Sequence, residues 1–143
     1  MKVKIVKFYD DAIIPQYQTA GAAGFDFCAH LAAPVTLKPG EIHAFDTGVG
    51  VELPAGYELQ IRSRSGLAYK HSVTLLNGIG TIDSDYRGEM RVLLKNHGDH
   101  NFVVEPGMRI AQGVIAQYAH VEWEEVAELS ESDRTGGFGS TGL

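Results

Sequence analysis

Short apolar runs bounded by turn residues are the feature that most constrains the fold of this chain. Within them apolar side chains alternate with polar ones or form brief unbroken stretches, which is typical of β-strands. The turn sequences between them include KPG, LPAG, NHGDH and EPG. Only SGLAYKH suggests a turn of helix, and WEEVAEL suits a strand or a helix. The runs cover residues 3–8, 25–30, 42–53, 57–61, 90–95, 102–104 and 108–118, and they predict an all-β sandwich or jelly roll.

Length and composition fit one globular domain. The chain has 143 residues, of which 44% are hydrophobic and 21% charged. Its 12 basic and 18 acidic residues give a formal charge of −6, which would repel nucleic acid. No stretch is long and apolar enough to span a membrane, and MKVKIVKF reads as a strand and not as a signal peptide. The single cysteine, Cys28, fits a small core residue and favours a reducing, cytoplasmic compartment.

The composition changes where the polar SESDR leads into the glycine-rich RTGGFGSTG. We therefore divide the chain into a core domain, 1–129, and a flexible arm, 130–143. Glycine loses the most conformational freedom on ordering and adds no side chain to a core, so this segment gains little by packing on its own. A disordered tail is the simpler interpretation. The alternative is an arm that orders around a ligand, with Phe138 stacking on a base and the glycine amides around phosphates.

Two acidic residues follow a glycine-rich turn in NGIGTIDSDYRGE, residues 77–89. The glycines predict a tight hairpin, and Asp83 and Asp85 would share one face of an extended strand. Such a pair is most simply the solvated tip of a hairpin. The functional interpretation is that an ionised aspartate orients a water molecule and accepts its proton.

Basic and polar residues interrupt two other segments. RSRSGLA brings together Arg64, Ser65 and Gly66, whose guanidinium, hydroxyl and unobstructed N–H suit phosphate oxygens, although the same residues occur in ordinary solvated turns. GMRIAQGV places Arg109 and Gln112 in an otherwise apolar strand, where they fit either an interface or a ligand contact. The spacing alone does not decide between these interpretations.

Five segments, AGAAGFDF, RSGLA, NGIGTIDSDYRGE, RIAQ and GGFGSTG, occur in this order between residues 20 and 142. Together they resemble the five motifs of the homotrimeric dUTPases, the deoxyuridine triphosphate nucleotidohydrolases. The resemblance implies a jelly-roll subunit and a homotrimer whose active sites are shared between subunits. It also implies Mg²⁺ as the cofactor and hydrolysis of dUTP to dUMP and pyrophosphate.

The resemblance also assigns roles to individual residues. Asp83 corresponds to the base that deprotonates the water attacking the α-phosphorus, and Tyr86 would lie against the deoxyribose. Asp26 corresponds to an acid near the metal, which it would contact through water. The residues implied to hold the uracil are Asn77, Gly80, Thr81 and Ile82, with Arg91 completing the pocket. Those implied to hold the phosphates are Arg64, Ser65 and Gly66 of a second subunit, together with Gln112. The arm would close over the nucleotide with Arg134, Phe138, Gly139, Ser140 and Thr141.

Some positions depart from the pattern of this family. Ser63 stands where proline is common, which predicts a looser loop, and the interval between Arg134 and the double glycine is one residue short. A dCTP deaminase of the same fold is the nearest alternative, but it would need a glutamate in MRVLLKN, which has no carboxylate. A nucleotide-sensing module without turnover and a capsid-like jelly roll are further alternatives. The presence of Asp83 and of the arm favours the hydrolase.

Overall fold

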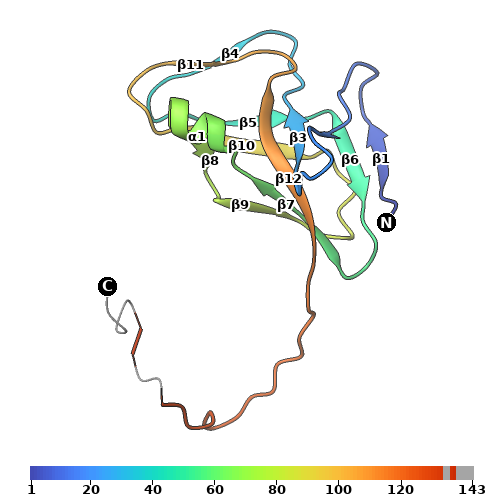
Figure 1. Cartoon of the computed structure of the whole chain (residues 1–143), viewed down its shortest axis with the longest axis vertical. Helices are drawn as coiled ribbons and strands as arrows, with labels where there is room; N and C mark the ends of the chain where they lie inside the picture. Colours follow the sequence, from blue (N-terminus) through green and yellow to red (C-terminus); the bar gives the residue numbers. More distant parts are fainter. Residues whose placement is uncertain (134–135, 138–143) are drawn as a thin grey trace.

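The protein is built almost entirely of antiparallel β-strands. The structure, a computed structural model, describes residues 1–133 and 136–137. Its strands form one five-stranded sheet, one three-stranded sheet and two pairs (Figure 1). Every strand pairing in the described part of the chain is antiparallel. The predicted all-β, jelly-roll-like class is therefore confirmed.

The sheets combine strands that lie far apart in the sequence. The five-stranded sheet has the order β2 (Gln16–Tyr17), β3 (Phe25–Cys28), β12 (Arg109–Gln117), β7 (Tyr57–Arg62) and β9 (Ile79–Ile82). The three-stranded sheet has the order β5 (Ile42–Asp46), β10 (Arg91–Asn96) and β8 (Val73–Leu75). The two pairs are β1 (Lys4–Lys7) with β6 (Val49–Glu52), and β11 (Phe102–Val104) with β4 (Val35–Leu37). In the described residues the one helix is α1 (Ser65–His71), which follows β7.

Alternate side chains of the strands fill a single core between the sheets. In β10, for example, Val92 and Leu94 are buried whereas Arg91 is exposed, as the two-residue period of a strand requires. The largest fully buried side chains are those of Phe27, Phe45, Leu37, Leu59, Ile61, Met90, Leu94 and Ile110. Burial of such side chains supplies most of the driving force for folding. The core thus fixes the strand ends, and the loops that extend from them carry the candidate site.

Two local predictions are wrong in detail. The run at 42–53 is not one strand, because it breaks at Gly48, whose φ of +72° suits glycine, and its halves β5 and β6 join different sheets. The hairpin predicted at 77–89 is also absent. β9 pairs with β7, and β10 pairs with β5 and β8, so the residues between β9 and β10 cross from one sheet to another. Long-range pairing decides both cases, and local glycines mark only where the chain turns.

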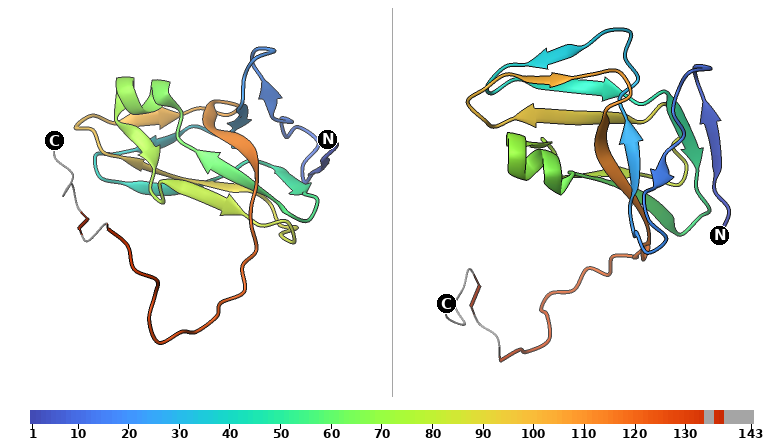
Figure 2. Two further views of the ribbon diagram at one scale, coloured as in Figure 1. Left: turned by 60° about the horizontal axis from the view of Figure 1, so that its bottom comes forward. Right: turned by 45° about the horizontal axis from the view of Figure 1, so that its top comes forward.

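Beyond β12 the chain leaves the sheets. Residues 118–133 are exposed and contain no helix or strand, and they run away from the body of the molecule (Figures 1 and 2). WEEVAEL, at 123–129, is part of this segment, so it forms neither of the two structures considered for it. The boundary between a core and an arm at residue 130 stays a prediction. No helix among the described residues has the length and apolar character needed to cross a membrane.

Candidate active site

β9 forms the edge of the five-stranded sheet, and the predicted uracil-binding residues lie on it. An edge strand has backbone N–H and C=O groups directed away from its single neighbour, and these are available to a planar ligand. Gly80 lies close to its neighbours: an added Cβ would lie 3.3 Å from both the Asn77 side-chain nitrogen and Ile61 Cβ, so a larger residue would crowd them. Asn77 and Thr81 are exposed. The structure therefore places Asn77, Gly80, Thr81 and Ile82 together on and beside β9, and their role in binding uracil stays a prediction.

Asp83 follows directly after β9 and opens onto a cavity of about 500 Å³. Ile82 pairs with Leu59 of β7, so Asp83 comes beside Glu58 across the sheet. The cavity is lined by Glu58, Thr81, Asp83, Ser84, Asp85, Tyr118 and His120. Asp83 is exposed and can therefore reach a water molecule. Glu58, Tyr118 and His120 escaped the sequence analysis because only the pairing of β7 with β9 and the course of the chain after β12 place them here.

Tyr86 lies on the loop that leaves this cavity. Its side chain is partly exposed, and its hydroxyl donates a hydrogen bond to the Glu89 carbonyl oxygen at 2.9 Å. The Tyr86 N–H donates to the Asp83 carbonyl at 3.2 Å, which closes a turn over Ser84 and Asp85. The ring and the Asp83 carboxylate therefore belong to one compact turn. Asp85 shares the cavity but lies in the turn and not on a strand, so the expectation of a shared strand face is wrong.

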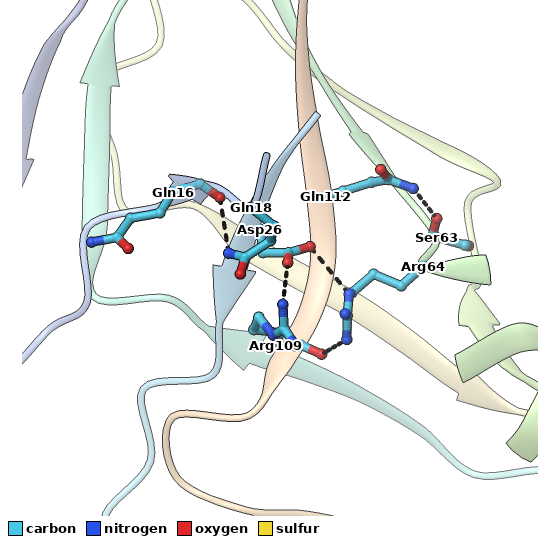
Figure 3. A network of polar contacts seen from close by, with 7 residues as sticks. All are labelled: Gln16, Gln18, Asp26, Ser63, Arg64, Arg109 and Gln112. Carbon is cyan, nitrogen blue, oxygen red and sulfur yellow. Dashed lines mark hydrogen bonds and ion pairs between the residues drawn. The ribbon is translucent and has the colours of Figure 1, made fainter. Parts of the chain in front are cut away.

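A second cluster lies at the other end of β7, around Asp26 (Figure 3). Arg64 donates from Nε to Asp26 Oδ1 at 3.1 Å and from Nη1 to the Arg109 carbonyl at 2.8 Å. Arg109 Nη1 donates to Asp26 Oδ2 at 3.0 Å. One carboxylate thus orients two guanidinium groups, and the three charges leave a net positive charge. An oriented pair of arginines of this kind suits phosphate oxygens.

The loop between β7 and α1 is tied at two points. Gln112 Nε2 donates to the Ser63 carbonyl at 2.9 Å, and the Ser63 hydroxyl accepts the Leu75 N–H at 2.9 Å. The Leu75 bond is one that a proline at this position could not accept, because a proline has no hydroxyl. These bonds hold the start of α1, where Ser65 and Gly66 lie exposed beside Arg64. The structure brings Arg64, Ser65, Gly66 and Gln112 into one neighbourhood, and their role in binding phosphates stays a prediction.

The Asp26 carboxylate has oxygen lone pairs available for a contact with a metal-bound water. Each carboxylate oxygen accepts one guanidinium N–H, and a carboxylate has about four lone-pair sites, so each oxygen keeps one for a metal-bound water. Direct coordination would compete with two adjacent positive charges. The described residues contain no group of three or more His, Cys, Asp or Glu side chains arranged to hold an ion. On the same strand, burial and then the charge of Asp26 raise the pKa of the Cys28 thiol.

Other predicted residues lie away from these clusters or outside the described residues. Arg91 is on β10, in the three-stranded sheet, where its Nε contacts Asp46 Oδ1 at 2.7 Å. Its role in the uracil pocket stays a prediction. The arm residues Arg134, Phe138, Gly139, Ser140 and Thr141 lie outside the described part of the chain.

Comparison with known proteins identifies the family. The family model for dUTPase matches residues 10–142 of this chain. The chain belongs to the dUTPase family. It is 54% identical to the deoxyuridine 5'-triphosphate nucleotidohydrolase of Nautilia profundicola over 143 residues, which cover 99% of both chains. It is 50% identical to that of Rickettsia felis over 144 residues, which cover 99% of this chain and 97% of the relative.

Solved dUTPases share the fold as well. A dUTPase variant of Staphylococcus bacteriophage 80alpha with bound dUpNHpp is similar over 99% of both chains, with a TM-score of 0.91 and 27% identity. A dUTPase variant from phage phi11 of S. aureus, which coordinates a structural Mg(II) ion, has a TM-score of 0.83 and 23% identity, and the match covers 92% of this chain and 100% of the phage chain. The recognition of this family from five sequence motifs is thus confirmed, over residues 10–142.

Proposed function

We infer that this chain hydrolyses dUTP to dUMP and pyrophosphate through attack of a water molecule on the α-phosphorus. The observation that carries this inference is the Asp83 carboxylate, exposed on a cavity at the end of an edge strand, in a chain of the dUTPase family. Asp83 accepts the proton of the attacking water, a role that contributes about 10²–10⁴-fold to the rates of enzymes. A dCTP deaminase is not favoured, because the relatives that are 54% and 50% identical to this chain are nucleotidohydrolases.

The geometry supports different roles for the residues on and after β9 and for the residues around Arg64. The exposed edge of β9 and the Asn77 amide bind the base, and Tyr86 packs against the deoxyribose. A ribose 2′-hydroxyl against this ring would be buried without a partner, which costs about 1–3 kcal/mol. Arg64, Ser65 and Gln112 bind the phosphates and stabilise the charge that develops on the leaving pyrophosphate. The arm residues beyond 133 close over the nucleotide and exclude water.

The separation of Asp83 from Arg64 supports a site shared between subunits. The chain from Glu58, beside Asp83, to Arg64 is extended through β7, which at about 3.3 Å per residue separates them by about 20 Å. This is much longer than a triphosphate, which argues against Arg64 holding the phosphates of the nucleotide whose α-phosphorus lies beside Asp83 of the same chain. We propose that Arg64 reaches the nucleotide from a neighbouring copy in a homotrimer. Heterologous contacts that close into a ring generate sites of this kind.

Complementation between inactive variants tests the shared site. Asp83→Asn and Arg64→Ala chains are co-expressed, and the mixed trimers are assayed for pyrophosphate release. If each site takes Asp83 from one chain and Arg64 from a fixed neighbour, random assembly restores about a quarter of the sites. Sites confined to one chain would recover no activity on mixing, and that outcome would contradict the proposal.

Mg²⁺ fits this site when it binds together with the triphosphate. When bound, it supplies positive charge to the phosphate oxygens and orients them. It prefers oxygen ligands and keeps several of its waters, so the triphosphate and water complete its coordination. Asp26, with one lone-pair site free on each oxygen, holds the ion through such a water. The half-buried, unpaired Cys28 further supports a reducing, cytoplasmic compartment for the protein.

A pyrophosphate-release assay over dUTP, dTTP, dCTP and UTP, with and without Mg²⁺, tests the activity. We expect release from dUTP in the presence of Mg²⁺, and ammonia released from dCTP would instead identify a deaminase. Asp83→Asn should keep nucleotide binding and lose about 10²–10⁴-fold in kcat. Asp85→Asn removes the same charge from the same cavity and is the matched control, expected to keep most of the activity. If the Asp85 variant were the inactive one, the assignment of the base would be wrong.

A further inference from the structure

The turn that carries Asp83 and Tyr86 gains little rigidity from the core. Asp83, Asp85, Tyr86 and Arg87 are all exposed, and this stretch crosses between two sheets without pairing to either. Ordering an exposed backbone costs roughly 1–2 kcal/mol per residue. Polar contacts must therefore define where the aspartate and the tyrosine lie.

Arg87 makes such contacts within the turn. Its Nη1 donates to the Ser84 carbonyl at 2.7 Å and to the Tyr86 carbonyl at 2.9 Å. The guanidinium thus joins two carbonyl oxygens on either side of Asp85. A charged donor makes stronger hydrogen bonds than a neutral one, and the planar guanidinium loses less freedom in forming them than a flexible ammonium does.

Glu89 connects the far side of the turn to the body of the protein. Its carboxylate accepts the Gly48 N–H at 2.7 Å, just before β6, and its carbonyl accepts the Tyr86 hydroxyl at 2.9 Å. Gly88, between Arg87 and Glu89, has no room for a side chain: an added Cβ would overlap the Tyr86 hydroxyl. The tyrosine is therefore fixed at its hydroxyl by Glu89 and at its backbone by Arg87.

We propose that Arg87 and Glu89 are positioning residues that brace the turn from Asp83 to Tyr86, and that this brace sets the selectivity for deoxyribose over ribose. The second part rests on the proposed function, in which Tyr86 packs against the sugar. Neither residue needs to touch the nucleotide. Each acts through the position of Tyr86 and, through the same turn, of Asp83.

Arg87→Met tests the brace, because it keeps an unbranched apolar stem and removes the guanidinium donors. We expect kcat/KM for dUTP to fall about tenfold, which corresponds to about 1.4 kcal/mol, and the ratio of kcat/KM for dUTP to that for UTP to fall as well. Arg87→Lys keeps a charged donor and should recover part of both. Lys38→Met, which removes an exposed cation far from the site, should behave as the parent. An unchanged dUTP:UTP ratio in Arg87→Met would overturn the selectivity claim.

Gly88→Ala provides a second variant that leaves Arg87 in place. Its Cβ pushes the Tyr86 hydroxyl away from Glu89, so the same loss of discrimination against UTP is expected. If Gly88→Ala kept the discrimination of the parent, the position of Tyr86 would not be what selects the sugar.

Hydrogen exchange tests the brace without reference to catalysis. The amides of residues 83–90 should exchange faster in Arg87→Met than in the parent or in Lys38→Met, because opening of the turn becomes easier. Equal exchange rates in the three proteins would show that Arg87 braces nothing. A parent that released no pyrophosphate from dUTP would refute the proposed function, whereas the exchange rates would still decide the brace.

Discussion

Replacing Asp26 with asparagine tests how Arg64 and Arg109 are held. The Asp26 side chain is 13% exposed and accepts hydrogen bonds from Arg64, which is 25% exposed, and Arg109, which is 45% exposed. Asparagine has nearly the same shape but only one acceptor oxygen. The NH₂ group of its amide would face the N–H groups of one guanidinium. Both are donors, so no hydrogen bond can form between them.

The magnitude follows from the number and exposure of these bonds. A hydrogen bond to a charged group contributes about 1.5–3 kcal/mol, and the variant loses one bond and the charge that strengthens the other. The partial exposure of Arg109 reduces its share, since exposed ion pairs contribute only about 0–1 kcal/mol. We therefore expect a loss of about 2–3 kcal/mol in the free energy of unfolding. For a chain of this size that lowers Tm by roughly 5–10 °C.

Thermal unfolding at one fixed protein concentration measures this loss, because the stability of an oligomer depends on concentration. Glu52→Gln is the control: it breaks the Lys4–Glu52 ion pair, whose side chains are 80% and 43% exposed, and should leave Tm nearly unchanged. The KM for dUTP should also rise in Asp26→Asn alone. If both variants melted at the same temperature, the reasoning on the Asp26 cluster would be refuted.

Three further substitutions or reactions probe the core and the β3 strand. Asn96→Ala removes a buried side-chain amide that forms hydrogen bonds with the Leu37 carbonyl and other backbone groups. It should lower the free energy of unfolding, measured in urea, by about 3 kcal/mol or more, and a loss under about 1 kcal/mol would contradict this. Gly113→Ala adds a Cβ that overlaps Phe27 and should cost about 1–3 kcal/mol by the same measurement. Because burial raises the pKa of the Cys28 thiol, less thiolate is present at neutral pH, so iodoacetamide should label the native protein more slowly than the urea-unfolded chain.

The fold class could be predicted because its main strands carry their own signal. The alternation at 57–61 and 90–95 corresponds to β7 and β10, each buried on one face. β2 has only two residues and β8 only three, and so short a stretch shows no measurable periodicity. The break at Gly48 was missed because the apolar pattern continues through it. Periodicity records which side chains are buried and does not record where the chain changes sheets.

The candidate site could be predicted in its parts and not in its assembly. The motifs around Asp83 and Arg64 contain residues suited to their chemistry, so they were found from the sequence. The contact of Asp26 with Arg109 depends on the pairing of β3 with β12, including the shift of register after Arg109. The place of Glu58 beside Asp83 depends likewise on the pairing of β7 with β9. Such pairings join distant segments, and no local pattern specifies them.

The register of β7 also gives a physical reason for the proposed division of the site between copies. A strand holds its two ends at a fixed separation, so Asp83, beside one end of β7, and Arg64, beyond the other, cannot approach each other within one chain. Bending β7 would break its pairing with β12 along the centre of the sheet, where Leu59 and Ile61 are fully buried. Bringing a second copy alongside costs none of these contacts. A rigid sheet with short loops would therefore gain a complete site most readily by association of two copies. In each copy, Arg87 would hold the turn that carries Asp83 and Tyr86, and Asp26 would hold Arg64 and Arg109.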